Sequence, residues 1–329
     1  MLEHGGKLRE ASLKYGRSDW LDLSTGLNPN GYPAPALSAD AWHRLPEDDP
    51  ALLQAATAFY GAPQLLAVAG TQAAIQALPR LRQPARVAVS APSYAEHLHH
   101  WSQHGHTALA VPYAALDNAV QDGADVLVIC NPNNPTGAVV PRTQLLAWAD
   151  RLAARGGWLV VDEAFADTDG VHAVADCSQR PGLIVLRSVG KFFGLAGLRL
   201  GFVAAQAPIL DALADLLGPW TISGPAQQVA RAALADRLWQ QETRAALRAR
   251  GERLGALLAD HGIESAGTAL FRWWPEAQAE AFHDFMARRG IWVRLFTAAG
   301  RGIRLGLPPD ETGWQRLAQA LNEWTKEAR

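Results

Sequence analysis

The sequence predicts an α/β protein with a mostly parallel central sheet, helices on both of its faces, and a smaller α/β domain after it. Between about residues 65 and 205, short apolar runs alternate with segments of helical periodicity, the pattern of strand–helix–strand units. After Pro219 a long helical stretch and a few short strands follow. We therefore expect an N-terminal arm at 1–40 that packs with the small domain, a large domain at 41–218 and a small domain at 219–329.

Apolar, β-branched runs bounded by Gly, Pro, Asn or Asp are the predicted strands of the large domain. They cover residues 86–90, 125–130, 158–163, 183–188 and 198–205. Helical spacing lies between them at 94–105 and 142–157, where Gly105 and Gly156 suit C-terminal stops. A parallel sheet binds its ligand beyond the carboxyl ends of its strands, so residues that follow the strands are the candidates for a site.

The flanking segments complete the prediction. Residues 224–262 are predicted to be helical with an interruption near Gly251. The small domain adds the segment 268–274, a helix at 279–290, two strand-like pieces at 291–296 and 302–307, and a terminal helix from about 310. The first forty residues are predicted to be irregular, because the segment 23–35 is rich in turn residues.

The composition excludes several classes of partner. A net charge of −2, without a basic stripe, gives no electrostatic case for nucleic acid or an anionic membrane. No apolar run reaches the length of a bilayer span, and the N-terminus lacks the apolar region of a signal peptide. Cys130 and Cys177 have neither disulfide-framework nor metal-site spacing. We expect a cytoplasmic protein without bound metal.

Lys191 is notable because the chain has very little lysine. It is the only lysine between Lys14 and Lys326, and arginine supplies nearly all the other positive charge. Arginine stays protonated, whereas a lysine amine can lose its proton and attack a carbonyl. A Walker phosphate loop would need glycine at 185 and Ser or Thr at 192, but the chain has Val185 and Phe192. The segment therefore predicts a Schiff base, above all with the aldehyde of pyridoxal phosphate.

Polar residues follow two other predicted strands. Asp162 ends the strand at 158–163, where an acid serves a site or only caps the backbone. Asn131 and Asn134 follow the strand at 125–130 within "CNPNNPTG", which offers amide donors to a ligand or forms only a turn.

Two further segments offer groups that suit a cofactor. Gly70, Thr71 and Gln72 open a helix, where free backbone N–H groups attract an anion, although Thr71 could equally be a plain N-cap. Tyr94 follows the strand at 86–90, and its ring could stack on a ligand or pack in the core.

The order and spacing of "GTQ", "PSY", "NPNNPTG", "DEAF", "SVGK" and "LAGLRLG" resemble the fold-type I pyridoxal-phosphate enzymes, the aspartate aminotransferase superfamily, over almost the whole chain. The resemblance implies pyridoxal 5'-phosphate as cofactor, Lys191 as its catalytic covalent anchor, and Asp162 as the partner of the pyridinium nitrogen. It implies that Asn134 bonds the ring's 3-oxygen and that Tyr94 stacks on the ring. The cofactor's phosphate would be held by Gly70, Thr71 and Gln72 together with Ser188 and Arg199.

Two branches of this superfamily resemble the chain most, the histidinol-phosphate aminotransferases and the threonine-phosphate decarboxylases of cobalamin synthesis. The opening "HGG", the segment "LDLSTGLNPNGYP", and Phe165 where many aminotransferases have a tyrosine favour the decarboxylases. That branch implies decarboxylation of L-threonine O-3-phosphate to (R)-1-amino-2-propanol O-2-phosphate. Transamination of the histidinol-phosphate type is the alternative, and a catalytically idle homologue is a third hypothesis.

The resemblance also implies substrate-binding residues, namely His4, Gly5, Asn28, Asn134, Arg294 and Arg304. A substrate with a phosphate and a carboxylate needs several donors, and the arginine fork suits a carboxylate. Arg294 and Arg304 could instead be surface cations on strands, and His4 a solvated terminus. The superfamily builds its site at a subunit interface, which implies a homodimer. Leu45 occupies the position of a tyrosine that normally reaches the partner's cofactor phosphate, so one cross-subunit hydrogen bond is missing.

Overall fold

The computed structural model describes residues 4–298 and 300–327. Within them the chain packs as two compact units. Unit 1 comprises the described residues of 1–30, 134–138 and 243–329, and unit 2 comprises 31–133 and 139–242. Each unit has its own sheet.

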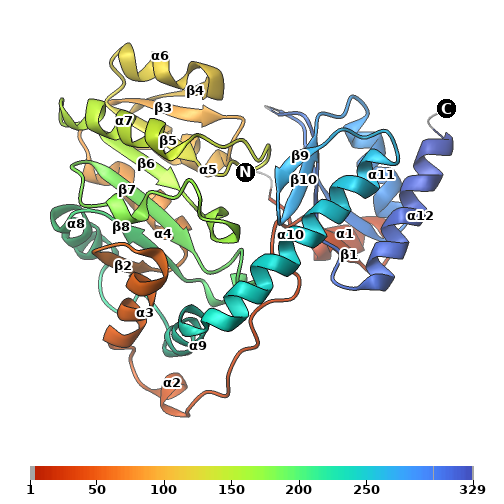
Figure 1. Ribbon diagram of the computed structural model, residues 1–329, viewed down its shortest axis with the longest axis horizontal. Helices are drawn as coiled ribbons and strands as arrows, with labels where there is room; N and C mark the ends of the chain where they lie inside the picture. The colour runs from red at the N-terminus through yellow and green to blue at the C-terminus, as the bar shows by residue number, and fades with distance from the viewer. Residues whose placement is uncertain (1–3, 299, 328–329) are drawn as a thin grey trace. The chain divides into compact units, whose positions relative to one another are not determined.

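Unit 2 is built on a seven-stranded sheet of order β2-β8-β7-β6-β5-β3-β4, which Figure 1 shows in that succession. The strands are β2 (Leu65–Val68), β3 (Arg86–Ala91), β4 (Thr107–Pro112), β5 (Val126–Cys130), β6 (Trp158–Asp162), β7 (Leu183–Ser188) and β8 (Gly201–Ala204). Only β8 runs against its neighbours β2 and β7, and the other pairs are parallel. The predicted α/β class with a mostly parallel sheet is therefore confirmed.

The strand predictions for this sheet differ from the structure at three places, the first of which is β2, which was not among the predicted strands. β4 was missed because it is an edge strand with mostly exposed side chains, so it lacks the apolar pattern of a buried strand. β8 begins at Gly201 rather than at 198, because a 3-10 turn over Ala196–Leu198 and a left-handed Arg199 (φ 52°) precede it.

Helices cover both faces of this sheet, as the alternation predicted. They are α2 (Asp40–His43), α3 (Pro50–Tyr60), α4 (Thr71–Ala77), α5 (Ala95–Gln103), α6 (Leu116–Gln121), α7 (Arg142–Ala153), α8 (Ala207–Leu217) and α9 (Gly224–Ala235). Helices α4, α5 and α8 share a core with the side chains of Val128, Val160 and Leu186, which lie on one face of the sheet. α6 and α7 pack against each other, and α7 packs on β6.

Unit 1 holds a five-stranded sheet of order β1-β11-β12-β10-β9. Its elements are α1 (Leu8–Tyr15), β1 (Leu21–Leu23), most of α10 (Arg237–Ala259), β9 (Ala266–Thr268), β10 (Phe271–Trp274), α11 (Ala279–Arg288), β11 (Ile291–Phe296), β12 (Gly302–Gly306) and α12 (Glu311–Glu327). β1 is parallel to β11, so a strand from the start of the chain completes a sheet formed by its end.

The division into units differs from the expected boundaries at 40 and 218. Tyr32 N–H donates to the Phe193 carbonyl at 2.8 Å, which ties the chain to unit 2 before residue 40. α9 packs on α2 and α3, so the segment after Pro219 also belongs to unit 2.

Two local predictions were wrong, one of them only in part. The first forty residues are irregular only in part, because they contain α1 and β1, whereas residues 24–39 form neither helix nor strand as predicted. The long helical stretch is interrupted at Asp236, whose ψ of 83° separates α9 from α10, and not near Gly251. Gly251 lies inside α10, where an added Cβ would come within 2.9 Å of the Ala269 Cα. The glycine permits close backbone packing rather than ending the helix.

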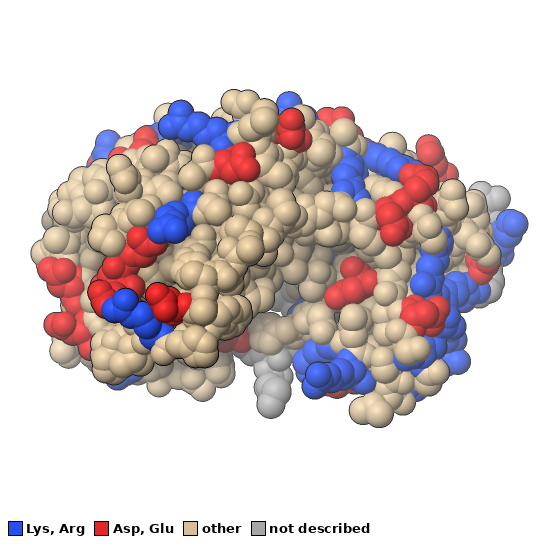
Figure 2. Space-filling view, turned by 90° about the horizontal axis from the view of Figure 1, so that it is seen from below, with Lys and Arg blue, Asp and Glu red and all other residues tan. Residues whose placement is uncertain are grey.

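The surface mixes charges of both signs. Figure 2 shows Lys and Arg interspersed with Asp and Glu over the face that it presents, in keeping with the net charge of −2. Among the described residues, no helix is long and apolar enough to cross a membrane.

Candidate active site

Most of the residues predicted to bind the cofactor lie at one edge of the seven-stranded sheet. Because β8 is reversed, its first residue lies beside the ends of its neighbours. Gly201 at the start of β8 is in register with Val68 at the end of β2 and with Ser188 at the end of β7. Likewise Cys130 at the end of β5 is in register with Asp162 at the end of β6. The topology therefore places strand-end residues from distant parts of the sequence together.

A cation, two hydroxyl side chains and backbone N–H groups meet where β2, β7 and β8 adjoin. An added Cβ on Gly70 would come within 2.5 Å of Arg199 Nη2, and one on Gly201 within 2.8 Å of the Thr71 nitrogen. Ser188 is buried at the end of the adjoining strand. Only glycine lets the backbone and the guanidinium approach this closely. This donor set fits a phosphate group, because it combines a fixed positive charge with hydroxyl and backbone donors.

A buried ion pair stands at the end of β6. His97 Nε2, from α5, lies 3.0 Å from Asp162 Oδ2, and the other carboxylate oxygen accepts the Ala164 N–H at 3.0 Å. Burial alone would lower the pKa of His97, but the interactions with Asp162 and Cys130 raise it to about 10. His97 thus carries a positive charge at neutral pH and stabilises the negative charge of Asp162. The sequence did not single out His97, because it is one of several histidines in a helical segment.

The same three side chains also have the spacing of a metal site. The ligand atoms of His97, Cys130 and Asp162 lie within 4.8 Å of one another, and all three residues are buried. In the metal-free protein the raised pKa keeps His97 protonated, so the ring acts as a hydrogen-bond partner of the Asp162 carboxylate. A carboxylate held in this way suits the protonated ring nitrogen of a cofactor.

Tyr94 is held by a chain of hydrogen bonds. Its hydroxyl donates to Gln72 Oε1 at 3.1 Å, and Gln72 Nε2 donates to Glu96 Oε2 at 2.8 Å. His100 Nε2 lies 3.0 Å from the same carboxylate oxygen. Burial raises the pKa of Tyr94, so the ring stays a neutral phenol. Gln72 and the unpredicted Glu96 thereby fix the ring that was predicted to stack on the cofactor.

Lys191 lies three residues beyond the end of β7 and is partly buried. Its Nζ stands 5.5 Å from the centroid of the Phe165 ring. An aromatic face attracts an ammonium group through the negative charge of its π-system. Phe165 follows Asp162 by three residues, so β6 and β7 bring the carboxylate, the aromatic ring and the amine to one edge of the sheet.

Within unit 1, two of the predicted substrate residues, Arg294 and Asn134, lie beside Arg304. Arg304 on β12 is in register with Arg294 on β11. Its Nη2 donates to the Ser24 carbonyl at 2.7 Å, its Nη1 donates to Asn134 Oδ1, and its Nε has no partner among the described residues. Burial and the neighbouring Arg294 lower the pKa of Arg304. The side chain is therefore a buried cation whose hydrogen-bond partners are neutral.

The N-terminal segment reaches the same place through Ser24. An added Cβ on Gly5 would come within 2.5 Å of the Ser24 carbonyl oxygen, and Gly6 N–H donates to Ser24 Oγ at 2.7 Å. His4 precedes them and is exposed. Asn28 is buried, and its Oδ1 accepts the Asn30 N–H at 3.0 Å, which shapes the local turn. Ser24 was not predicted, although it joins the glycines to Arg304.

Asn131 and Asn134, the two candidate asparagines of "CNPNNPTG", have different surroundings. Asn131 is a turn residue, because it accepts the Val140 N–H at 2.8 Å and donates to the Val140 carbonyl at 3.1 Å. Asn134 belongs to unit 1, where Arg304 donates to its side chain.

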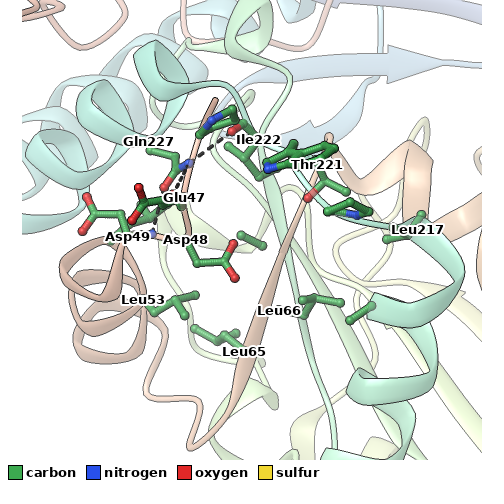
Figure 3. A pocket seen from close by; sticks show the side chains of 17 residues that line it. Glu47, Asp48, Asp49, Leu53, Leu65, Leu66, Leu217, Thr221, Ile222 and Gln227 are labelled. Atoms are coloured by element: carbon green, nitrogen blue, oxygen red, sulfur yellow. Dashed lines mark hydrogen bonds between the residues drawn. The ribbon is translucent and has the colours of Figure 1, made fainter. Parts of the chain in front are cut away.

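A cavity of 310 Å³ in unit 2 has walls that include none of the predicted residues. Figure 3 shows acidic side chains of Glu47, Asp48 and Asp49 and apolar side chains of Leu53, Leu65, Leu66 and Leu217 around it. Gln227 braces one wall, because its amide donates to the Glu47 and Ile222 carbonyls at 3.0 and 3.1 Å. This cavity is separate from the strand-end cluster that fits a phosphate.

Comparison with known proteins agrees with this geometry. The chain is 52% identical over 324 residues to a threonine-phosphate decarboxylase of Pseudomonas aeruginosa, which covers 98% of this chain and 97% of the relative. It is 42% identical over 334 residues to a threonine-phosphate decarboxylase of a Sinorhizobium species, with 97% of each chain covered.

The fold is also that of known aminotransferases. A solved histidinol-phosphate aminotransferase of Sinorhizobium meliloti, in complex with pyridoxal-5'-phosphate, superposes with a TM-score of 0.85 at 24% identity and covers 100% of this chain and 96% of its own. The model of the family "Aminotransferase class I and II" matches residues 19–321. The chain therefore belongs to the aminotransferase class I and II family.

Proposed function

We propose that this protein is a pyridoxal-phosphate-dependent decarboxylase that converts L-threonine O-3-phosphate to (R)-1-amino-2-propanol O-2-phosphate and CO2. The observation that carries the proposal is the full-length similarity, at about half of all positions, to proteins named threonine-phosphate decarboxylase. The buried cation Arg304 also supports the proposal. Its hydrogen-bond partners are neutral, and a substrate with a carboxylate and a phosphate would give it an anionic partner.

Bound pyridoxal phosphate supplies an aldehyde for covalent attachment and a protonated ring that withdraws electrons from the substrate's α-carbon. In this proposal Lys191 holds the aldehyde, and Asp162, supported by His97, pairs with the ring nitrogen. Tyr94 lies against the ring face. Gly70, Thr71, Ser188 and Arg199 hold the cofactor's phosphate.

Lys191 would have a second task in the reaction. Its amine would deliver a proton to the carbon that has lost CO2, so that a new C–H bond replaces the broken C–C bond. Arg304 and Arg294 hold the substrate's anionic groups, with His4, Gly5, Asn28 and Asn134 around them. By holding the carboxylate, Arg304 and Arg294 would set the orientation of the bond that breaks.

Transamination of the histidinol-phosphate type is the alternative, and it would use the same residues. The decarboxylase proposal is favoured because both highly similar relatives carry that name. A cytoplasmic location remains a prediction.

The first prediction concerns the reaction. The purified protein with pyridoxal phosphate should release CO2 and aminopropanol phosphate from L-threonine O-3-phosphate, and Lys191→Ala should lower the rate by at least about 10²–10⁴-fold, the share of positioned proton transfer alone. Released CO2 and mass spectrometry of the product measure it. Amino transfer from glutamate to imidazole-acetol phosphate, without release of CO2, would instead establish the alternative.

A second prediction concerns Arg304. The charge of Arg304 is buried beside Arg294, so a bound anion should stabilise the wild-type protein. The same anion should stabilise the Arg304→Met variant less. The melting temperature is measured in the cofactor-free protein with and without millimolar L-threonine O-3-phosphate. Arg301→Met is the matched control, because Arg301 pairs with Glu280 at the surface and should leave the stabilisation unchanged. Equal stabilisation of wild type and Arg304→Met would contradict the assignment.

A third prediction follows from the raised pKa of His97. A folded-state pKa of about 10, against 6.5 for an ordinary histidine, means that the pair with Asp162 stabilises the fold fully below about pH 6.5. That contribution falls as the pH rises through 10. The difference in melting temperature between wild type and His97→Asn should therefore shrink between pH 6.5 and 10. A constant difference over this range would show that His97 is neutral in the folded protein.

A fourth prediction concerns assembly, for which we infer a homodimer. Unit 2 leaves several large apolar side chains 60–66% exposed, namely Trp42, Leu45, Trp220 and Leu238. A second copy would cover such surface, and Leu45 stands where related families place a side chain that reaches the partner. Leu45→Arg should shift the protein toward monomer in sedimentation equilibrium. Leu109→Arg, at an equally exposed position of the edge strand β4, should not shift the protein toward monomer. If Leu45→Arg remains a dimer, the interface lies elsewhere.

A further inference from the structure

A buried arginine, Arg187, joins the strand that carries Lys191 to the loop that carries Phe165. Arg187 is the residue before Ser188 on β7, so its side chain points to the opposite face of the sheet. On that face its Nη1 donates to Glu163 and its Nη2 to Asp167. All three side chains are at most 5% exposed. We call these three residues the Arg187 clamp.

The clamp is anchored on two more sides. The Arg187 guanidinium lies 4.5 Å from the centroid of the Tyr60 ring on α3. Glu163 Oε1 accepts the Val174 N–H at 2.6 Å, which ties down the far end of the same loop. Burial would lower the pKa of Arg187, but Asp167 and Glu163 raise it, so the guanidinium stays charged. Burial also raises the pKa of Glu163, against the effect of Arg187.

Such a buried cluster is a costly way to stabilise a fold. Desolvation of the charges offsets much of their attraction, and apolar side chains of similar volume often give equal or greater stability. The neighbours of Arg187 in the sheet are apolar: Val185 on β7 and Phe202 on the adjacent strand β8 are both fully buried. Stability alone therefore does not account for an arginine and two carboxylates at this position, whereas fixed geometry does.

The geometry that the clamp fixes is that of Phe165. Glu163 and Asp167 lie two residues before and two residues after Phe165, so both flanks of this short loop are bound to Arg187. Phe165 is 6% exposed, and its ring is the one that faces Lys191 Nζ. Arg187 lies four residues before Lys191 on the same stretch of chain. One guanidinium thus sets the separation of the loop and the strand end.

We propose that Arg187 is a positioning residue, which holds Phe165 against Lys191 from the opposite face of the sheet. The inference rests on the proposed function, because it gives Lys191 the role of binding the cofactor. Arg187 acts through Phe165 and does not touch the cofactor. Loss of the clamp lets the Phe165 loop move, and the lysine amine then loses one of the surfaces that define its position.

The test compares variants by two readouts that do not need turnover. Cofactor-free protein is titrated with pyridoxal phosphate, and the dissociation constant is read from quenching of the intrinsic fluorescence. Borohydride reduction followed by intact-protein mass spectrometry then gives the fraction of Lys191 joined to the cofactor over time. Arg187→Met should raise the dissociation constant about tenfold or more and slow covalent attachment. Glu163→Gln, which weakens only one arm of the clamp, should give a smaller effect in the same direction.

Two controls separate positioning from general stability. Val185→Ala removes packing on the same strand and the same face, so it should lower the melting temperature but leave the dissociation constant within about threefold of wild type. Phe165→Ala should reproduce the effect of Arg187→Met. The double variant should be no worse than either single one, because both act through the same contact.

The outcomes are distinct. An unchanged dissociation constant and attachment rate in Arg187→Met, or additive effects in the double variant, would overturn the positioning role. An Arg187→Met effect no larger than that of Val185→Ala, at equal loss of melting temperature, would do the same. If Arg187→Met does not fold, Glu163→Gln and Asp167→Asn carry the comparison. Failure of the wild-type protein itself to bind pyridoxal phosphate would instead refute the proposed function.

Discussion

The reversal of one strand, β8, is the constraint on which the cofactor cluster depends. A βαβ crossover would have placed the residues before β8 at the amino edge of the sheet, far from the ends of β2 and β7. Reversal brings Arg199 beside Gly70, and Gly201 beside the Thr71 nitrogen. A guanidinium and the free backbone groups after β2 then face the same space as Ser188. The phosphate-like donor set is thus a product of topology, since no single segment of the sequence contains it.

The buried charges divide into two kinds. His97 faces Asp162 on one side of the sheet, and Arg187 faces Glu163 and Asp167 on the other, so these charges are compensated within the protein. Arg304 donates hydrogen bonds to the neutral Ser24 carbonyl and Asn134 side chain and lies 5.2 Å from the centroid of the Phe271 ring, and its pKa is lowered rather than raised. A buried cation without a carboxylate at hydrogen-bonding distance is costly, and an anionic ligand removes that cost.

The sequence predicted the residues that stand at strand ends, because position after a buried strand is itself a signal. Lys191 and Asp162 were singled out in this way, Ser188 was implied by the family resemblance, and the structure places all three at one edge. His97 was missed because its partner Asp162 is 65 residues away and no local sequence pattern distinguishes this histidine within a helix. Arg187 was missed for the same reason, since within an apolar strand it has no visible partner until the loop folds back. The helix interruption predicted near Gly251 was wrong, because a glycine that breaks a helix and one that allows close packing look alike in sequence.

The two faces of β6 and β7 therefore perform different tasks with neighbouring residues. Asp162 and Ser188 face the side that suits the cofactor, while Glu163 and Arg187, each one residue away, face the opposite side. Because strand residues alternate, the position of the first pair is rigidly linked to that of the second. A change on the hidden face can then alter binding without contact to any ligand.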